Sequence, residues 1–234
     1  MHGCKLLFLL IPLILVALFA PKKSPPAEDL HFSPSTAPIQ TEPAPSPTLE
    51  LPCVARGSEL IVEKILSYEG EFWEDGTNAY AVNIAALVVY NPAPYGIRKA
   101  EILICQGQRQ LAFYISYLPP NSRVLVQERC RNAYAPGDLT QCRCTLLETL
   151  PWQDGALTVE DAGMDALLLK NETEAPLASV TLHYRLYSEE FGLYLGGISH
   201  QITASPLLPG ESLRLQPAHY TKNRSRVTLV ETEQ

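Results

Sequence analysis

The segment Ala86–Asn91 reads Ala-Leu-Val-Val-Tyr-Asn, and it returns 80 positions later as Ala166–Asn171, Ala-Leu-Leu-Leu-Lys-Asn. Both segments are apolar runs that end at an asparagine. Two further pairs of segments recur in the same order with similar spacing: Trp73–Gly76 with Trp152–Gly155, and Leu118–Ser122 with Leu208–Ser212. Self-similarity of this kind predicts two copies of one structural unit.

Around these matches, apolar and polar residues alternate with a period of two, which is the pattern of β-strands with one buried face. Proline, glycine and asparagine separate the runs. We therefore expect an all-β protein with two tandem immunoglobulin-like β-sandwich domains, residues 53–150 and 151–234. Residues 132–140 have room for one short helical turn. The expected strands are Leu60–Leu66, Val82–Tyr90, Arg98–Cys105, Leu111–Leu118, Arg123–Gln127, Val180–Leu186, Glu211–Leu215 and Arg224–Val230.

The N-terminus carries Leu6–Ala20, an unbroken run of 15 apolar residues behind Lys5. A charged start followed by an apolar middle is typical of a signal peptide. A cleavable signal has small residues at −3 and −1, whereas Leu18 would occupy −3 here and Pro21 would follow the cut. We expect an uncleaved signal-anchor helix, residues 1–20, in a single-pass protein of the cell membrane whose C-terminal domains are extracellular. Cleavage would instead give a secreted protein.

Residues 21–52 hold nine of the 20 prolines in the chain, together with many serine, threonine and alanine residues. Such a segment buries too little apolar surface to offset its ordering entropy, so we expect a disordered, Pro-rich linker. At about 3.1 Å per residue, a stretched linker of this composition would reach roughly 100 Å. The segment would then hold the two sandwiches away from the membrane as a stalk.

A resemblance to a known family comes from Tyr184–Ser188, Tyr-Arg-Leu-Tyr-Ser, which resembles the Phe-x-Leu-Tyr-Asp signature of the FxLYD domain. The segment lies between Asn171–Thr173, similar to that family's strand-ending Asn-x-Ser/Thr, and Leu207–Glu211, similar to its Leu-x-Pro-Gly-Glu turn. Over residues 57–231, the chain also resembles short membrane-anchored bacterial surface proteins with two such sandwiches. The resemblance implies a fold and a cell-surface location, and it implies no activity. The segments that match this group are Val82–Asn91, Tyr194–Ile198 and Ser225–Val230.

An acidic cluster is the first candidate for chemistry, because Glu69, Glu71, Glu74 and Asp75 surround Trp73. A general acid and a general base could be drawn from such a group. The dipeptide that Asp75 forms with the following glycine is a turn signal, so an acidic hairpin turn is the more common explanation. Calcium binding is a weaker alternative, since no alternating Asp-x-Asp loop is present.

Two histidines lie in the strand regions of the second copy. His183 shares its side of the strand with Thr181 and Arg185, so we expect it to face solvent. His200 lies with the apolar side of its strand, so we expect it to be half-buried. Neither these histidines nor the acidic cluster forms a recognisable motif, and we predict no catalytic residue, no cofactor-binding residue and no metal site.

Five cysteines follow the apolar run, and export into an oxidising space favours at least one disulfide. Cys130 paired with Cys142 or Cys144 would close a small loop between the two domains. Cys53, at the end of the linker, is the candidate for pairing with another molecule. The chain has no Cys-x2-Cys knuckle, so a zinc site is disfavoured. The connectivity of these four and of Cys105 stays open, and buried free thiols remain an alternative.

A glycine pair, Gly196-Gly197, interrupts the apolar run Leu193–Ile198. A glycine pair inside a strand usually marks a bulge or a close approach of another backbone. Phe191 and Tyr194 place aromatic rings beside it. These rings either cap a hydrophobic core or form a recognition surface, and both readings stay open.

Composition and organisation together favour one class of function. The net charge of −7 argues against nucleic acid, whose phosphates demand a basic surface. We expect a non-enzymatic, membrane-anchored surface protein that presents two β-sandwich domains for protein or glycan contact. The alternatives are an accessory structural factor of a cell-envelope complex and an enzyme with a site between the domains.

Overall fold

The computed structural model describes residues 48–233, apart from 78, 153–156 and 205. These residues form an all-β protein with 13 strands in three sheets. The expected signal-anchor and nearly all of the Pro-rich linker lie outside the described residues. Within the described part, no helix is long and apolar enough to cross a membrane.

Six long strands of the first half divide into two groups of three, and every pairing within a group is antiparallel. One group has the order β2-β3-β6 and the other the order β5-β4-β7. A two-residue strand, β1 (Cys53–Val54), extends the first group beside β2. The bounds are β2 Ile61–Glu71, β3 Tyr80–Asn91, β4 Gly96–Gln106, β5 Arg109–Leu118, β6 Ser122–Gln127 and β7 Leu139–Leu150.

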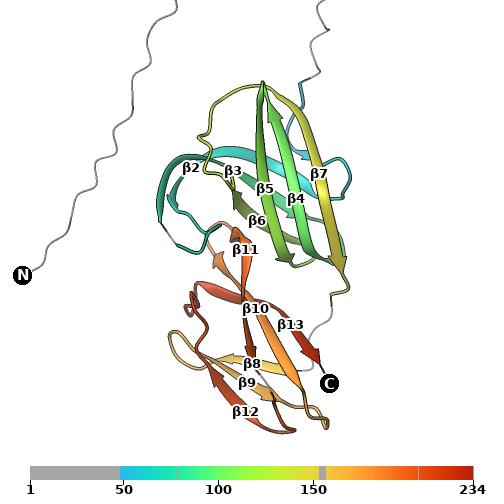
Figure 1. The fold of residues 1–234 in the computed structure, drawn as a ribbon, viewed down its shortest axis with the longest axis vertical. Helices are drawn as coiled ribbons and strands as arrows, with labels where there is room; N and C mark the ends of the chain where they lie inside the picture. The colour runs from blue at the N-terminus through green and yellow to red at the C-terminus, as the bar shows by residue number, and fades with distance from the viewer. Residues whose placement is uncertain (1–47, 78, 153–156, 205, 234) are drawn as a thin grey trace, which may run out of the picture. The chain divides into compact units, whose positions relative to one another are not determined.

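The last six strands repeat this arrangement with the same internal order. One group is β8-β9-β12 and the other is β11-β10-β13, again with antiparallel pairs throughout. Figure 1 shows β5, β4 and β7 side by side, and likewise β8, β9 and β12. The bounds are β8 Leu157–Asp161, β9 Leu167–Asn171, β10 Ser179–Ser188, β11 Leu193–Ala204, β12 Ser212–Leu215 and β13 Ser225–Glu233.

A parallel pairing joins the two halves. In β6, Val124 and Leu125 lie opposite Tyr194 and Leu195 of β11. This contact continues the first group of one half into the second group of the other, and the result is a seven-stranded sheet of order β1-β2-β3-β6-β11-β10-β13. A shared sheet fixes the two halves to each other through main-chain hydrogen bonds rather than through a linker alone.

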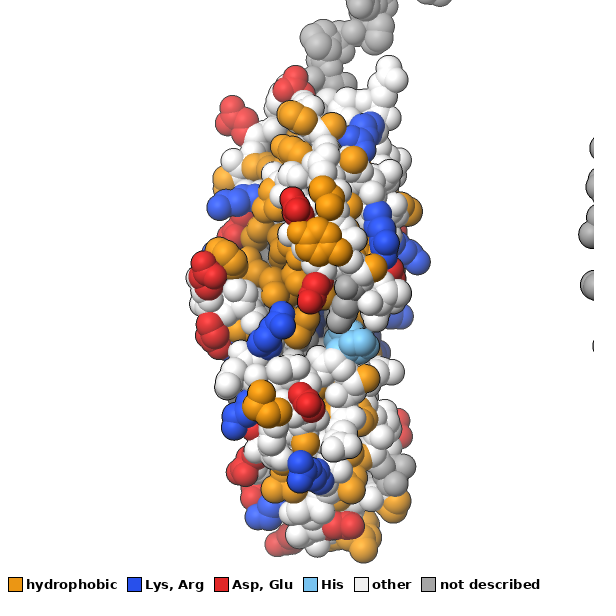
Figure 2. Space-filling model, turned by 90° about the vertical axis from the view of Figure 1, so that its left-hand side faces the viewer, with side chains coloured by type: hydrophobic (Ala, Val, Ile, Leu, Met, Phe, Trp, Pro, Cys, Tyr) orange, Lys and Arg blue, Asp and Glu red, His pale blue; other side chains and the backbone are white. Residues whose placement is uncertain are grey.

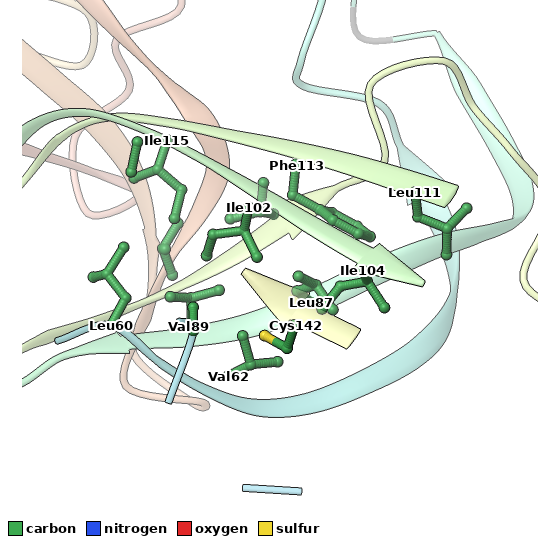
Figure 3. Close-up of a cluster of buried hydrophobic side chains, with 14 of the residues drawn as sticks. Leu60, Val62, Leu87, Val89, Ile102, Ile104, Leu111, Phe113, Ile115 and Cys142 are labelled. Carbon is green, nitrogen blue, oxygen red and sulfur yellow. The ribbon is translucent and has the colours of Figure 1, made fainter. Parts of the chain in front are cut away.

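Each half has its own hydrophobic core between its two groups of strands. Strand β3 is buried on both faces: Leu87 and Val89 point into the first core, whereas Ala86 and Val88 pack in a separate cluster with Trp73. A strand covered on both sides reads as a continuous apolar run, as this one does. Figure 3 shows the first core, whose labelled members are Leu60, Val62, Leu87, Val89, Ile102, Ile104, Leu111, Phe113, Ile115 and Cys142.

The repeated asparagines end corresponding strands, β3 and β9, and make corresponding hydrogen bonds. Asn91 Nδ2 donates to the carbonyls of Tyr95 and Pro119, both at 3.0 Å, and its Oδ1 accepts from the backbone N–H of Ala93. In the second half, the same three bonds join Asn171 to Ala175, Leu207 and Thr173. Both side chains are fully buried, and each one ties the end of its strand to the following loop and to a distant strand connection.

The other two sequence matches behave differently. Leu118 is fully buried, and its counterpart by burial is Leu207, because Leu208 is exposed. The expected pair of Leu118 with Leu208 is therefore wrong by one position. Trp73 follows β2, whereas Trp152 precedes β8, so the two tryptophans do not occupy corresponding places.

Residues 132–138 contain no helix. The expected turn of helix is wrong, because the segment runs along the sheet instead: Ala133 forms a bridge with Ile84, and the backbone N–H of Tyr134 donates to the carbonyl of Asn83.

Replacing either repeated asparagine tests their equivalence. Asn91→Ala and Asn171→Ala each remove at least three hydrogen bonds of a fully buried side chain, so each should lower the free energy of unfolding by roughly 2–4 kcal/mol. The measurement is urea unfolding followed by tryptophan fluorescence. The exposed Asn132→Ala is the matched control and should change stability by less than about 0.5 kcal/mol. A large loss in one half with none in the other would contradict the equivalence.

Candidate functional site

The connection between β2 and β3 carries two side chains to the place where the two halves meet. Trp73 is buried against Tyr68, with ring centroids 5.4 Å apart. Its backbone N–H donates to Oε1 of Gln127 at 2.8 Å, and Nε2 of Gln127 returns a bond of 2.7 Å to the carbonyl of Glu71. This exchange fixes the connection on β6 and directs the next residue, Glu74, toward β11.

Glu74 links the two halves through main-chain donors. Its Oε1 accepts from the backbone N–H of Gln127 in β6 at 2.9 Å and from that of Gly197 in β11 at 2.7 Å. Burial raises the pKa of Glu74 to about 7, although these N–H groups and the nearby Arg185 pull the pKa down. The carboxylate is therefore held at the junction by its surroundings, and its charge is costly there.

Arg185 lies on β10, near Glu74, and its side chain is fully buried. Its Nη1 donates to the carbonyl of Gly196 at 2.7 Å, and its Nη2 donates to the carbonyls of Gly197 and Ser116. Burial lowers the pKa of Arg185 to about 10, and the negative charge of Glu74 opposes that shift. One side chain thus joins β10 to the bulged part of β11 and to β5.

The glycine pair makes room for this arrangement. The pairing of β10 with β11 jumps from Tyr184 opposite His200 to Leu186 opposite Leu195, so a wide bulge faces Arg185. Gly196 has φ of +81°, and a Cβ on Gly197 would lie 1.9 Å from the carbonyl oxygen of Tyr114. A bulge or a close backbone approach was expected at the glycine pair, and both occur: the bulge spans the pair, and the close backbone approach is at Gly197.

A second polar contact closes the junction between β5 and β10. His183 stacks on Tyr117 with ring centroids 3.7 Å apart, and its Nε2 lies 2.8 Å from a carboxylate oxygen of Glu231. Arg98 reaches the same carboxylate at 3.2 Å. Burial lowers the pKa of His183, and the carboxylate opposes that shift.

Two expectations about β10 are wrong, because His183 and Arg185 are both buried rather than turned to solvent. The face of β10 that carries them is covered by β5 and by the bulge of β11, two contacts that alternation along one strand does not reveal. His200 is half-buried as expected, and it stacks on Tyr184.

The acidic residues around Trp73 do not converge on one point. Glu69 accepts from the hydroxyl of Tyr80, and Glu71 accepts from Nε1 of Trp73. Asp75 holds Thr77 and Arg131, which lowers the pKa of its carboxyl, mainly through the bonds from Thr77. Among the residues that the structure describes, no group of three or more His, Cys, Asp or Glu side chains is placed to hold a metal ion.

Among the hollows beside the junction, two adjoin Glu74 or Trp73. The smaller is a polar cavity of about 410 Å³ lined by Glu74, Tyr114, Gln127, Arg129 and Ile198. The larger, which we call the apolar groove, has a volume of about 620 Å³ and lies over the outer face of the seven-stranded sheet. Figure 2 looks onto the β2 side of the molecule, where hydrophobic side chains gather between charged ones. The groove is lined by Glu63, Lys64, Leu66, Tyr68, Trp73, Val88, Arg123, Leu125, Ser188, Phe191, Leu193 and Leu195.

The aromatic residues near the glycine pair divide between packing and exposure. Tyr194 packs against the first core and meets Tyr187 edge-on, with centroids 5.1 Å apart. Phe191 is 66% exposed at the rim of the apolar groove. Tyr194 is thus a packing residue of the first core, whereas Phe191 presents its ring to solvent at the rim of the groove.

Comparison with known proteins gives no assignment: no protein family, no characterised protein and no solved structure matches this chain.

The raised pKa of Glu74 makes a signed prediction. A carboxyl whose pKa is 4.5 in the unfolded chain and about 7 in the folded one binds its proton more tightly when folded. Its contribution to stability is full below pH 4.5 and is lost as the pH rises through 7, by about 3 kcal/mol. The difference in unfolding free energy between wild type and Glu74→Gln should fall by this amount between pH 4.5 and 8, as measured by urea unfolding. The exposed Glu190→Gln should show no such slope, and a flat difference for Glu74→Gln would contradict the assignment.

Proposed function

We propose that this chain is a non-enzymatic, membrane-anchored surface protein whose two immunoglobulin-like sandwiches share one binding site, the apolar groove. The proposed occupant is an extended segment of a partner protein that places apolar side chains in the groove. The observation that carries the proposal is the groove itself, a concave apolar surface formed jointly by the two halves.

The strand order supports the tandem immunoglobulin-like reading. Numbered within each half, the strands lie in the orders 1-2-5 and 4-3-6. These orders correspond to A-B-E and C′-C-F of the immunoglobulin fold. The matching bonds of Asn91 and Asn171 support a common origin of the halves. The resemblance to FxLYD domains and the boundaries 53–150 and 151–234 are part of the same proposal.

The composition of the groove favours protein over glycan. Leu66, Val88, Leu125, Leu193 and Leu195 provide an aliphatic surface with no fixed pattern of hydrogen-bonding groups. Sugars are recognised by hydrogen bonds to hydroxyl groups, whereas aliphatic side chains gain free energy from contact with such a surface, about 25 cal/mol per Å² buried. The lining therefore suits the aliphatic or aromatic side chains of a protein.

The border of the groove favours an extended segment. β1 pairs with Ile61 and Val62 of β2, so within the described residues the rest of β2 is bonded on its β3 side. Bulges interrupt β2 at Glu63 and Glu69, and the five residues between them pair regularly with β3. A regular open edge accepts an added strand, whose alternate side chains then point to one face. On β2, that face carries Lys64, Leu66 and Tyr68 into the groove.

The surroundings of Glu74 argue for binding rather than catalysis. This carboxylate is the acidic group that lines the polar cavity, and its Oε1 already accepts two main-chain N–H groups. A general acid or base needs to exchange protons with a substrate. Glu74 instead joins β6 to β11 and thereby holds the groove together.

Partner binding can be tested with a decapeptide library displayed on phage and selected on the full-length protein. Selected peptides should alternate apolar residues, and Phe191→Ser should weaken the binding of a selected peptide at least tenfold, about 1.4 kcal/mol. Tyr80→Ser is the matched control, because Tyr80 is 67% exposed but does not line the groove. Binding that survives Phe191→Ser, or selective binding of an N-acetylglucosamine oligomer at this site, would contradict the proposal.

Membrane anchoring is tested separately. With Leu18 at −3 and Pro21 at +1, the chain should stay full length in the membrane fraction and be detected there by an antibody against its N-terminus. A soluble protein that begins near Pro21 would show cleavage and secretion instead. Exchange of Leu6–Ala20 for an unrelated anchor should leave function intact, and loss of function after the exchange would favour the accessory role in an envelope complex.

A further inference from the structure

The short strand β1 lies between β2, with which it pairs, and β7. Cys53 of β1 lies opposite Val62 of β2. Three residues later, Arg56 pairs with β7: its backbone N–H donates to the carbonyl of Cys142 at 3.1 Å, and its carbonyl accepts from the N–H of Cys144 at 2.8 Å. The start of β1 is therefore fixed between two sheets, and Cys142 and Cys144 lie on its β7 side.

Two of these thiols meet. Cys142 is 4% exposed within the first core, where Figure 3 shows it beside Val62. Cys53 packs against the same core, and its thiol lies close enough to contribute to the raised pKa of the Cys142 thiol.

The other three thiols are engaged or lie apart. Cys105 Sγ donates to Oε1 of Gln141, and Cys144 Sγ donates to the carbonyl of Leu146. Cys130 is exposed in the connection between β6 and β7. All five cysteines of the described residues are reduced in the structure.

We propose that Cys53 and Cys142 are disulfide partners, and that their bond fastens the end of the linker to β7. This differs from the sequence-based expectations, in which Cys130 paired with Cys142 or Cys144 and Cys53 paired with another molecule. The pair rests on the packing of β1, and it is independent of the apolar groove.

The oxidation needs an external disulfide, such as oxidised glutathione or the disulfide of an oxidoreductase. The thiolate of the more exposed Cys53 attacks one sulfur of that donor, and the first donor thiol leaves. The thiolate of Cys142 then attacks Cys53 in the mixed disulfide and releases the second donor thiol. Two protein thiols have lost two electrons and two protons, and the donor has gained them as two thiols.

The second step has a distinct pH dependence. Burial raises the pKa of Cys142 to about 12, and the adjacent Cys53 adds to that shift. The thiolate is the attacking species, so its small population at neutral pH limits ring closure. The rate of bond formation should therefore rise with pH between 7 and 9.

The bond also has a structural consequence. β1 pairs with β2 at two positions, so hydrogen bonds alone hold it weakly. Tension on the linker reaches Leu49 first, whose N–H donates to the carbonyl of Leu139, and then Cys53, the residue that begins β1. A covalent bond to Cys142 passes that tension to β7 and leaves the pairing of β1 undisturbed.

Peptide mapping tests the pair directly. The full-length protein is purified in detergent under reducing conditions, oxidised with oxidised glutathione, blocked with N-ethylmaleimide and digested with trypsin. Arg129, Arg131 and Arg143 separate the neighbouring cysteines, so each of the five lies on its own tryptic peptide. Mass spectrometry should find residues 24–56 linked to residues 132–143, with the other four cysteines, Cys4 among them, blocked.

Variants distinguish the possible outcomes. Cys53→Ser should abolish the link and leave Cys142 blocked, whereas Cys130→Ser should leave the link intact. Oxidation should raise the Tm of the wild type by about 5–10 °C and leave that of Cys53→Ser unchanged. A link from Cys130 to Cys142 or Cys144, a dimer joined through Cys53, glutathione adducts without a link, or an unchanged wild-type Tm would each overturn the proposal.

Discussion

Arg185 is the constraint on which the junction depends. A guanidinium without water needs oxygen atoms in its place, because an unpaired buried charge costs several kcal/mol. The carbonyls of Gly196 and Gly197 come from the bulge of β11, and that of Ser116 comes from the first half of the chain. Moving the halves apart would take away the Ser116 carbonyl and the nearby negative charge of Glu74, and would leave Arg185 with the carbonyls of its own half alone. The network mainly fixes the position of β5 relative to β10 and β11. Buried ionic groups often add little net stability, but an arrangement that leaves the guanidinium without its partners is strongly destabilised.

The apolar groove exists because that junction is fixed. Leu66, Val88 and Leu125 come from the first half, whereas Leu193 and Leu195 come from the second. Trp73 lies between the two sets. A Cβ added to Gly196 would lie only 2.9 Å from the Cβ of Trp73. The glycine pair thus serves two purposes at once: it frees two carbonyls for Arg185, and it lets the tryptophan ring approach the bulge. For the partner proposed above, a groove already formed by both halves would lower the cost of binding.

Local pattern and long-range packing differ in how far they could be predicted. Alternation identified β2, β10 and β13, because a half-buried strand displays its buried face in the sequence. Alternation missed β7 and β8, because their burial patterns are irregular. It also placed Arg185 on the solvent side of β10, because the burial of Arg185 depends on contacts with β5 and β11. The bulge at the glycine pair was predictable, because glycine there has a local cause. The closeness of Cys53 to Cys142 was not predictable. The two residues are far apart in the sequence, and they come together because the segment of β1 lies against β7.

A head-to-tail contact between similar units can be repeated indefinitely, and within the described residues it occurs once. The strand that occupies the place of β6 in the second half is β12, which is four residues long and carries exposed Ser212 and Arg214. Short length and charge both discourage a further strand at an open edge. The strand that occupies the place of β11 in the first half is β5, which pairs with β4 without an irregularity and has no glycine pair. It therefore lacks the bulged carbonyls that a buried arginine requires. Within the described residues, each docking feature occurs in one half and its complement in the other, so the contact between β6 and β11 joins two surfaces that differ from each other.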